Sequence, residues 1–246
     1  MPDIIAIIPA RYDSTRFPGK ILADQTGRPL IQHVYELAQR VASLDRVFVA
    51  TDDRRIDEAV RGFGGETILT RSDHPNGTSR IAEAAMAIDA DIIVNLQGDE
   101  PQLEPALIEL TIQRLLDHPP DPMATLASPF MADEDPADPN IVKVVLDGEG
   151  RARSFSRSIE TGEQNENTNP DPPLKHIGLY VYRSDFLQTY IKLPPTPREQ
   201  AERLEQMRVL EHNYTIQVAL GEVRHHGIDT PEQYARFVEW YRTQTA

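Results

Sequence analysis

Hydrophobic and polar positions along the first half of the chain predict strands and helices in turn. Asp3 to Pro9 is a short apolar run, typical of a buried parallel strand. The stretch 29–42 repeats its apolar residues at the spacing of one helical face. Further strands are predicted at 46–50, 66–70 and 91–96, and helices at 56–62, 78–88 and 104–117. This alternation predicts an α/β fold, a Rossmann-like mixed and mostly parallel sheet with helices on both faces.

The second half follows a different pattern. Strands are predicted at 123–130, 175–182 and 215–220, and a hairpin through Gly148-Glu149-Gly150 is expected to join strands at 141–146 and 152–156. The stretch 198–212 predicts one helix, and Thr230-Pro231-Glu232-Gln233 predicts the start of the last one. The polar segment 158–173 predicts a loop, either disordered or a lid. We expect a single domain over 1–246 with a mixed-sheet excursion at about 120–185.

The charge and composition exclude several classes of protein. Lys and Arg total 25 against 39 Asp and Glu, a net charge of -14, which disfavours nucleic acid and anionic membranes as partners. No apolar run approaches the roughly 20 residues of a membrane span. There is no secretory signal pattern, so the protein is expected in the cytoplasm. Cysteine is absent, which excludes disulfides, thiolate metal sites and a thiol nucleophile.

The loop after the first strand is basic although the chain as a whole is acidic. Arg11, Arg16 and Lys20 lie within ten residues, together with hydroxyl side chains and a glycine. Ligands of open α/β sheets lie at the carboxyl ends of strands, so this loop is favoured as a phosphate site over an ordinary basic surface loop. It contains neither the G-x-x-x-x-G-K-[ST] pattern of a Walker loop nor the G-x-G-x-x-G pattern of a dinucleotide site.

One acidic residue is a candidate metal ligand, another is a candidate helix cap, and one polar loop is a candidate nucleobase site. Asp99, in the Gln97-Gly98-Asp99-Glu100 turn after the fourth strand, suits magnesium, although an acidic helix start is an equal alternative. Asp229, taken alone, is better interpreted as a helix cap beside Thr230. The 70–80 loop could contact a nucleobase or simply connect two elements. The neighbouring His225 and His226 are expected to have structural or hydrogen-bonding roles.

At this point the residues identify a family. The segments IIPARYDSTRFPGK, VATDD, TRSDHPNGTSRIAE, VNLQGDEP, MATL, NIVKVVLD, FSRS, KHIGLYVYR, LEQMRVLEH and GIDTPEQ occur in this order over nearly the whole chain. In these segments the chain resembles the 3-deoxy-manno-octulosonate cytidylyltransferases, or CMP-Kdo synthetases. The resemblance implies a nucleotidyltransferase, usually a homodimer. It joins CTP to Kdo, an acidic 2-keto sugar, and gives CMP-Kdo and pyrophosphate for lipopolysaccharide or other Kdo-containing glycans.

The resemblance also implies roles for individual residues. The catalytic residues are Lys20, Arg11, Asp99 and Asp229, of which Asp99 and Asp229 bind Mg²⁺, the one cofactor. The CTP-binding residues are Pro9, Ala10, Arg11, Ser14, Arg16, Lys20, Arg71, Ser79, Gln97 and Gly98. The sugar-binding residues are Gln97, Arg157, His176, Tyr180, Glu205 and Gln206. Without the resemblance, the polar residues between 157 and 206 would be interpreted as surface or satisfied core positions, and Tyr180 as strand packing.

One segment departs from the family pattern. After Phe155-Ser156-Arg157-Ser158 the family usually continues with Ile-Pro, an aromatic residue and an Arg, whereas this chain continues Ile159-Glu160-Thr161-Gly162. In the family this stretch lies near the sugar. The alternatives to Kdo are therefore a related acidic sugar, such as 8-amino-Kdo or a sialic-acid-like sugar. A non-catalytic nucleotide-binding regulator is a further alternative.

Overall fold

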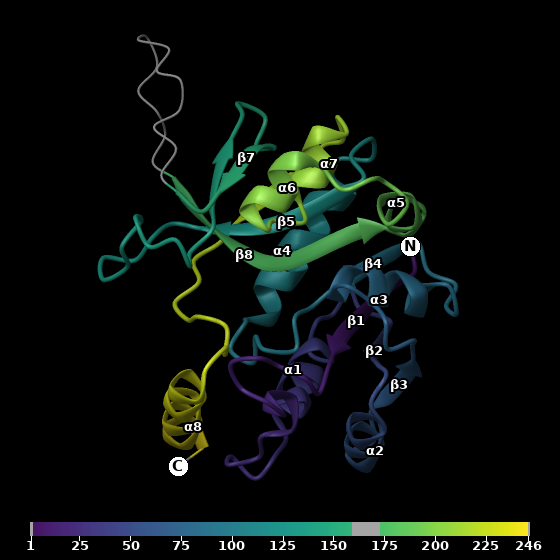
Figure 1. Cartoon of the computed structure of the whole chain (residues 1–246), viewed down its shortest axis with the longest axis vertical. Coiled ribbons are helices and arrows are strands. Elements are labelled where there is room, and N and C mark those ends of the chain that lie inside the picture. The colour runs from purple at the N-terminus through teal and green to yellow at the C-terminus, as the bar shows by residue number, and fades with distance from the viewer. Residues whose placement is uncertain (1, 159–172, 246) are drawn as a thin grey trace. The chain divides into compact units, whose positions relative to one another are not determined.

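The apolar run at the start of the chain forms a buried strand, β1 (Ile4–Ala10). The structure is a computed structural model that describes residues 2–158 and 173–245. β1 pairs in parallel with β2 (Arg46–Thr51) on one side and β4 (Ile92–Asn95) on the other, and β2 pairs in parallel with β3 (Glu66–Leu69). The strands thus run in the order β3-β2-β1-β4 (Figure 1), which confirms the predicted parallel sheet.

Helices connect these strands as crossovers. They are α1 (Leu30–Ala38), α2 (Arg54–Gly62) and α3 (Gly77–Ala85), and a short helix, η1 (Lys20–Leu22), precedes α1. Crossovers between parallel strands are right-handed, so this strand order places α1 and α2 on one face of the sheet and α3 on the other. The order reverses between β1 and β4, and the carboxyl ends of those two strands therefore form the switch point where α/β sheets bind ligands.

Polar residues in the loops fix where the helices begin. The Asp53 carboxylate accepts the N–H of Arg55 at 2.9 Å and caps α2. The Asn76 side chain accepts the N–H of Ser79 at 2.9 Å and caps α3. Each cap satisfies a backbone donor that has no partner inside the helix.

The last helix, α8 (Pro231–Thr245), packs on the beginning of α1. The N–H of Thr230 donates to Gln233 Oε1 at 3.0 Å, and the N–H of Gln233 donates to Thr230 Oγ1 at 3.3 Å, which is the predicted capping box. Its apolar residues Tyr234, Phe237 and Val238 form a buried cluster with Leu30 and Ile228.

The described chain forms two compact units. The first contains the residues up to Glu109 together with those from His225 onward, and the second contains Leu110–Arg224. The chain passes from the first to the second within α4 (Pro105–Leu116). The single domain with an excursion at about 120–185 stays a prediction.

The second unit is built on an antiparallel pair of strands. β5 (Met123–Ser128) pairs antiparallel with β8 (Leu174–Arg183) and parallel with β9 (Gln217–Leu220). β6 (Lys143–Leu146) and β7 (Ala152–Ser156) form the predicted hairpin, and β6 also pairs with β8. The register of β5 against β8 shifts between Thr125 and Leu126, a bulge that changes which side chains oppose one another.

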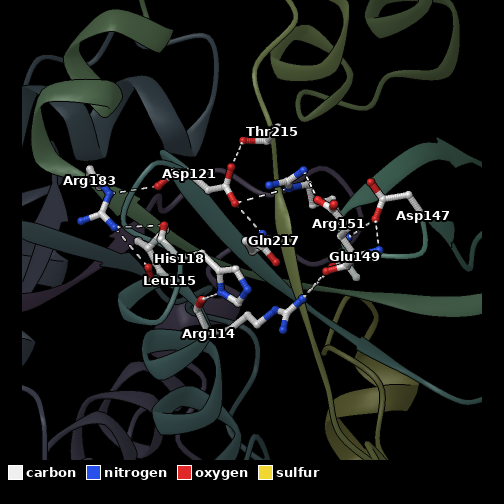
Figure 2. Close-up of polar contacts among 11 residues, drawn as sticks. Arg114, Leu115, His118, Asp121, Asp147, Glu149, Arg151, Arg183, Thr215 and Gln217 are labelled. Atoms are coloured by element: carbon white, nitrogen blue, oxygen red, sulfur yellow. Dashed lines mark hydrogen bonds and ion pairs between the residues drawn. The ribbon is translucent and has the colours of Figure 1, made fainter.

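A buried carboxylate ties this hairpin to β9. Asp121 accepts hydrogen bonds from Thr215 and Gln217 (Figure 2). Arg151 Nε lies 3.5 Å from Asp121 Oδ2. Burial alone would raise the pKa of Asp121, but these hydrogen bonds and the Arg151 charge outweigh it and lower the pKa. The charged carboxylate is therefore the stable form in the folded chain.

The helical region between β8 and β9 differs from the sequence prediction. The single helix predicted at 198–212 is wrong, because the structure has α6 (Pro197–Glu202) and α7 (Met207–Glu211). Arg203 separates them with a left-handed φ of 56°, which no α-helix contains. A further helix, α5 (Ser184–Tyr190), lies in a stretch for which no element was predicted. The predicted loop at 158–173 falls almost entirely outside the described residues. Of the helices described, none is long and apolar enough to cross a membrane.

Candidate active site

The loop after β1 and the turn after β4 meet at the switch point of the first unit. A Cβ on Gly98 would lie 3.0 Å from Ile21 Cδ1 and 3.4 Å from the carbonyl oxygen of Pro9, so glycine permits this approach. A Cβ on Gly77 would lie 3.3 Å from Pro9 Cγ. The start of α3 therefore also lies against β1. These contacts bring Pro9, Ala10 and Gly98, all predicted to bind CTP, next to the loop predicted to contact the base.

Lys20 and the two predicted metal ligands come together here. The Lys20 ammonium donates to Asp99 Oδ2 at 2.8 Å and to Asp229 Oδ1 at 3.3 Å. It also donates to the carbonyl oxygen of Ile228 at 2.6 Å. Lys20 is 8% exposed at its side chain, whereas Asp99 and Asp229 are 31% and 43% exposed. A buried cation thus faces two carboxylates that remain accessible to a ligand.

Asp229 is held in place by contacts on both sides of it. The N–H of Ile228 donates to the carbonyl oxygen of Asp99 at 2.9 Å. The N–H of Asp229 donates to Gln233 Oε1 at 2.7 Å, an extension of the α8 cap. The carboxylate of Asp229 also pairs with Arg16 at 2.9 Å. The helix-cap interpretation and the metal-ligand prediction for Asp229 are therefore compatible, because the cap engages the backbone N–H and not the carboxylate.

Glu100 contacts the segment that carries Asp229, a contact that the sequence did not indicate. Its carboxylate lies 3.4 Å from His225 Nε2, and a Cβ on Gly227 would lie 2.8 Å from its Oε1. Burial raises the pKa of Glu100, and the contact with His225 opposes that rise. The pair fastens the 225–229 segment to the turn that carries Asp99. The one sequence feature that could have indicated this contact is Gly227, since a close approach to the backbone often requires glycine.

The basic loop is closed by its own backbone. The N–H of Gly19 donates to the carbonyl oxygen of Tyr12 at 3.0 Å, and Gly19 has a left-handed φ of 71°. The Arg55 guanidinium lies over the Tyr12 ring, 3.3 Å from its centroid, while pairing with Asp53. Ser14 lies inside this closed loop and is half-buried. Tyr12 and Arg55 were not predicted, because a ring and a surface arginine carry no phosphate signature.

Of two arginines near this loop, Arg80 is strongly buried and Arg11 is half-buried. Arg80 is 1% exposed and pairs with Asp52 at 2.7 Å and Thr70 Oγ1 at 2.6 Å. Burial lowers the pKa of Arg80, and the charge of Arg11 lowers it further, although Asp52 opposes both. Within the described part of the chain, Arg11 Nη2 and Arg80 Nε have no hydrogen-bond partner. The neighbouring positive charges suit an anion at the loop, and Arg80 was missed because arginines are rarely buried.

A carboxylate organises the loop predicted to contact cytosine. Glu83 accepts the backbone N–H of Arg71 at 3.1 Å and its Nε at 3.0 Å. His74 bridges Glu83 and the hydroxyl of Ser79 through its two ring nitrogens. Arg71 and Ser79 are thus connected through Glu83 and His74, which the sequence did not indicate.

In the second unit, three of the predicted sugar residues form one polar group. His176 and Tyr180 lie on the same half-exposed face of β8, with ring centroids 5.5 Å apart. Tyr180 donates its hydroxyl to Gln206 Oε1 at 3.3 Å. Burial lowers the pKa of His176 to about 3, and burial together with Glu205 raises the pKa of Tyr180. The group is therefore uncharged at neutral pH and suited to hydrogen bonds with hydroxyls.

The remaining sugar candidates lie in different surroundings. Arg157 donates from Nε to the carbonyl oxygen of Glu202 at 2.9 Å and from Nη1 to that of Pro139 at 3.1 Å. The carbonyl oxygen of Glu205 accepts the hydroxyl of Tyr190 at 3.0 Å. Gln97 belongs to the first unit, where its amide donates to Asn95 Oδ1 at 3.0 Å.

The residues around Lys20 fit a magnesium ion. Oxygens of Asp99, Asp229 and Ile228 surround one positive nitrogen, so this point already stabilises a cation. Over residues 2–158 and 173–245 there is no group of three or more His, Cys, Asp or Glu that could hold a metal. Magnesium does not need one, since proteins usually hold it with one or two carboxylates plus substrate phosphates. Asp99 and Asp229 are the residues that would bind it.

Comparisons with known proteins show which family the chain belongs to. Residues 5–216 match the family model described as Cytidylyltransferase. The 3-deoxy-manno-octulosonate cytidylyltransferase of Syntrophobacter fumaroxidans is 51% identical over 232 residues, 93% of each chain. That of Geobacter metallireducens is 48% identical over 245 residues, 96% of each chain. A solved CMP:2-keto-3-deoxy-manno-octonic acid synthetase complexed with CTP has a TM-score of 0.92 at 42% identity, covering 98% of this chain and 99% of that one.

A basic loop and a carboxylate pair at the switch point of a doubly wound sheet are, with these matches, the features of a nucleotidyltransferase. The fold alone is shared more widely, as with a cytidylyltransferase from Leptospira borgpetersenii at 17% identity and a TM-score of 0.64. The chain belongs to the cytidylyltransferase family, and within it to the 3-deoxy-manno-octulosonate cytidylyltransferases.

Proposed function

We propose that this protein transfers the cytidylyl group of CTP to Kdo and releases pyrophosphate. The observation that carries the proposal is the meeting of Lys20, Asp99 and Asp229 at the switch point. A protein that only bound nucleotide would have little need for two accessible carboxylates beside a buried lysine. The relatives named 3-deoxy-manno-octulosonate cytidylyltransferase support the choice of sugar.

In the reaction, the anomeric hydroxyl oxygen of the sugar bonds to the α-phosphorus of CTP. The bond from this phosphorus to the oxygen that bridges to the β-phosphate breaks, and pyrophosphate leaves with the electron pair. The hydroxyl proton passes to solvent. Lys20, Arg11 and Arg16 would neutralise the triphosphate and stabilise the departing charge, as positioned cations do in phosphoryl transfer. Magnesium on Asp99 and Asp229 would add charge neutralisation and acidify the hydroxyl.

The base and the sugar would be recognised by different devices. The Glu83–His74 connection holds Arg71 and Ser79 for the cytosine ring. His176, Tyr180 and Gln206 offer uncharged hydrogen-bonding groups to sugar hydroxyls. Arg157, expected from the resemblance to bind the sugar, is our candidate for the sugar carboxylate. By the family resemblance we also propose a cytoplasmic homodimer whose product supplies lipopolysaccharide or another Kdo-containing glycan.

The test is pyrophosphate release from CTP with Kdo, 8-amino-Kdo and a sialic acid, repeated with UTP and ATP. We expect turnover with CTP and Kdo and much lower kcat/KM with UTP or ATP. The 8-amino-Kdo arm addresses the departure from the family pattern after Ser158. Turnover with none of these sugars, while CTP still binds, would favour a regulator and contradict the proposal.

The metal role has its own test. Asp99→Asn removes a charged ligand, so we expect kcat to fall by about 100-fold or more at saturating magnesium while the fold is kept. Circular dichroism and thermal melting check the fold. A variant that melts normally and retains at least half of the wild-type kcat shows that Asp99 does not bind a catalytic metal.

A further inference from the structure

The Lys20 ammonium has no hydrogen left for a substrate in this structure. An ammonium group carries three N–H donors, and those of Lys20 are directed at Asp99, Asp229 and the carbonyl oxygen of Ile228. The side chain is 8% exposed. Lys20 is therefore fully engaged with the same carboxylates that a metal would need.

Two cations cannot occupy this point together. Like charges a few ångströms apart repel strongly when they are partly shielded from water. We propose that Lys20 is the resident cation of the metal site: its ammonium holds Asp99 and Asp229 until a divalent metal takes that place, and Lys20 then turns to the triphosphate. This inference rests on the proposed function, because it assumes that Lys20 binds phosphate during the reaction.

The surroundings of Lys20 allow such an exchange without rebuilding the site. Asp99 and Asp229 are tied to one another by the bond from Ile228 N–H to the Asp99 carbonyl oxygen, and Asp229 is also held by Gln233. These bonds do not involve the lysine. Lys20 itself has a flexible four-carbon stem that can redirect its charge. The carboxylates can therefore keep their places while the ammonium leaves.

The arrangement couples the binding of metal and nucleotide. A metal without nucleotide has to displace Lys20 into a site that offers it no anion. A triphosphate without metal has to attract Lys20 away from two carboxylates. When both bind, each cation gains a set of anionic oxygens, so the two ligands should strengthen one another.

The direct test is metal binding by the nucleotide-free, full-length protein. Free Mn²⁺ is measured by electron paramagnetic resonance during titration of wild type, Lys20→Met and Lys20→Gln. Removing the competing charge should tighten Mn²⁺ binding by at least about tenfold in both variants. Arg61→Met is the matched control, since it removes one positive charge from an exposed pair with Asp57 on α2 and should leave Mn²⁺ affinity unchanged.

A second measurement separates exchange from simple loss of structure. In metal-free buffer Lys20→Met should melt at a lower temperature than wild type, because the two carboxylates then lose the buried cation between them and keep only the exposed Arg16 beside Asp229. Added Mg²⁺ should raise its melting temperature more than that of wild type. Asp99→Asn in the Lys20→Met background should relieve the repulsion and abolish the extra response to Mg²⁺.

Mn²⁺ affinity in Lys20→Met and Lys20→Gln that is equal to or weaker than in wild type overturns the proposal. The proposed function is decided separately by pyrophosphate release from wild type. If the wild type is active but the lysine variants bind Mn²⁺ no more tightly, the cation-exchange proposal is wrong and the proposed function stands. If the variants bind Mn²⁺ more tightly but the wild type turns over no sugar, the proposed function is wrong and the cation-exchange proposal stands.

Discussion

The hydroxyl of Thr125 fixes the protonation pattern of His176. Thr125 Oγ1 lies 2.7 Å from the carbonyl oxygen of Leu179 and 3.0 Å from His176 Nε2. A hydroxyl has one hydrogen to donate. Thr125 donates it to the carbonyl oxygen of Leu179, because a carbonyl oxygen can only accept. Toward His176 the hydroxyl therefore accepts, so Nε2 carries the hydrogen and Nδ1 presents a lone pair. In the proposed sugar site, His176 would accept a hydrogen bond from a sugar hydroxyl.

This half-buried, neutral histidine should make the fold sensitive to mild acid. Burial lowers the folded-state pKa of His176 from its ordinary 6.5 to about 3. Below pH 6.5 the unfolded chain binds a proton that the folded chain does not, so stability should fall as the pH drops from about 6.5 toward 3. His176→Asn should lose less stability over this range in urea titrations at successive pH values. Equal pH slopes for both proteins would show that His176 is not the group responsible.

Closure of the basic loop can be tested with two glycines. Gly19→Ala would place a Cβ 3.2 Å from the Tyr12 hydroxyl at a left-handed φ of 71°. We expect the loop to shift and the KM for CTP to rise several-fold. Gly27→Ala is the matched control, because its φ is 83° but no heavy atom lies within 4 Å of the added Cβ.

Both alanine variants should lose roughly 1–2 kcal/mol of stability to left-handed strain, yet only Gly19→Ala should impair CTP use. Steady-state kinetics and thermal melts of the pair measure the two effects. A KM for CTP that stays at the wild-type value in Gly19→Ala would show that crowding against Tyr12 does not reach the nucleotide.

Glu83 should matter for the choice of base. Glu83→Gln weakens the acceptor for both N–H groups of Arg71 and for His74, so we expect a lower ratio of kcat/KM for CTP over UTP. Asp73→Asn is the control, since Asp73 pairs with the same arginine at 3.8 Å in an exposed position. Such exposed pairs contribute about 0–1 kcal/mol, and the control should keep the wild-type ratio. A ratio changed equally by both substitutions argues against a specific role for Glu83.

Asp121 should stabilise the second unit through its charge. Asp121→Asn leaves Thr215, Gln217 and Arg151 facing an amide, and we expect a loss of about 1–3 kcal/mol in the free energy of unfolding. The folded pKa of Asp121 is below 3.8, so its contribution is complete above that pH and is lost as the pH falls through the folded value. Chemical denaturation at pH 7 and pH 3 should show the difference between wild type and variant shrinking in acid.

The local patterns in the first half were sufficient to predict its fold. The apolar run that forms β1 is short and ends at a loop, which favours a buried parallel strand. The cap of the last helix involves Thr230 and Gln233, which lie only three residues apart in the sequence. The break at Arg203 could not be predicted, because 198–212 is rich in good helix formers. Its left-handed residue is fixed by tertiary packing, which buries Leu204 and Gln206.

Some residues of the candidate site could likewise be predicted from the sequence, and others could not. That Lys20 and Asp99 would approach one another follows from two adjacent parallel strands whose carboxyl ends share an edge. Asp229 follows no neighbouring strand, so only the family resemblance indicated it. Glu83 and Glu100 were missed because a carboxylate that organises other side chains has the same local sequence as one that faces water.

The residues of the first unit are not contiguous in the chain, and this bears on how the protein is made. Lys20 and Asp99 leave the ribosome long before Asp229, because more than a hundred residues between Asp99 and Asp229 are synthesised first. The apolar residues of α8 that cover Leu30 arrive later still. A nascent chain halted before Asp229 can build β1 to β4, yet it lacks one of the paired carboxylates. Premature termination should therefore yield products that present the nucleotide loop without the means to use it.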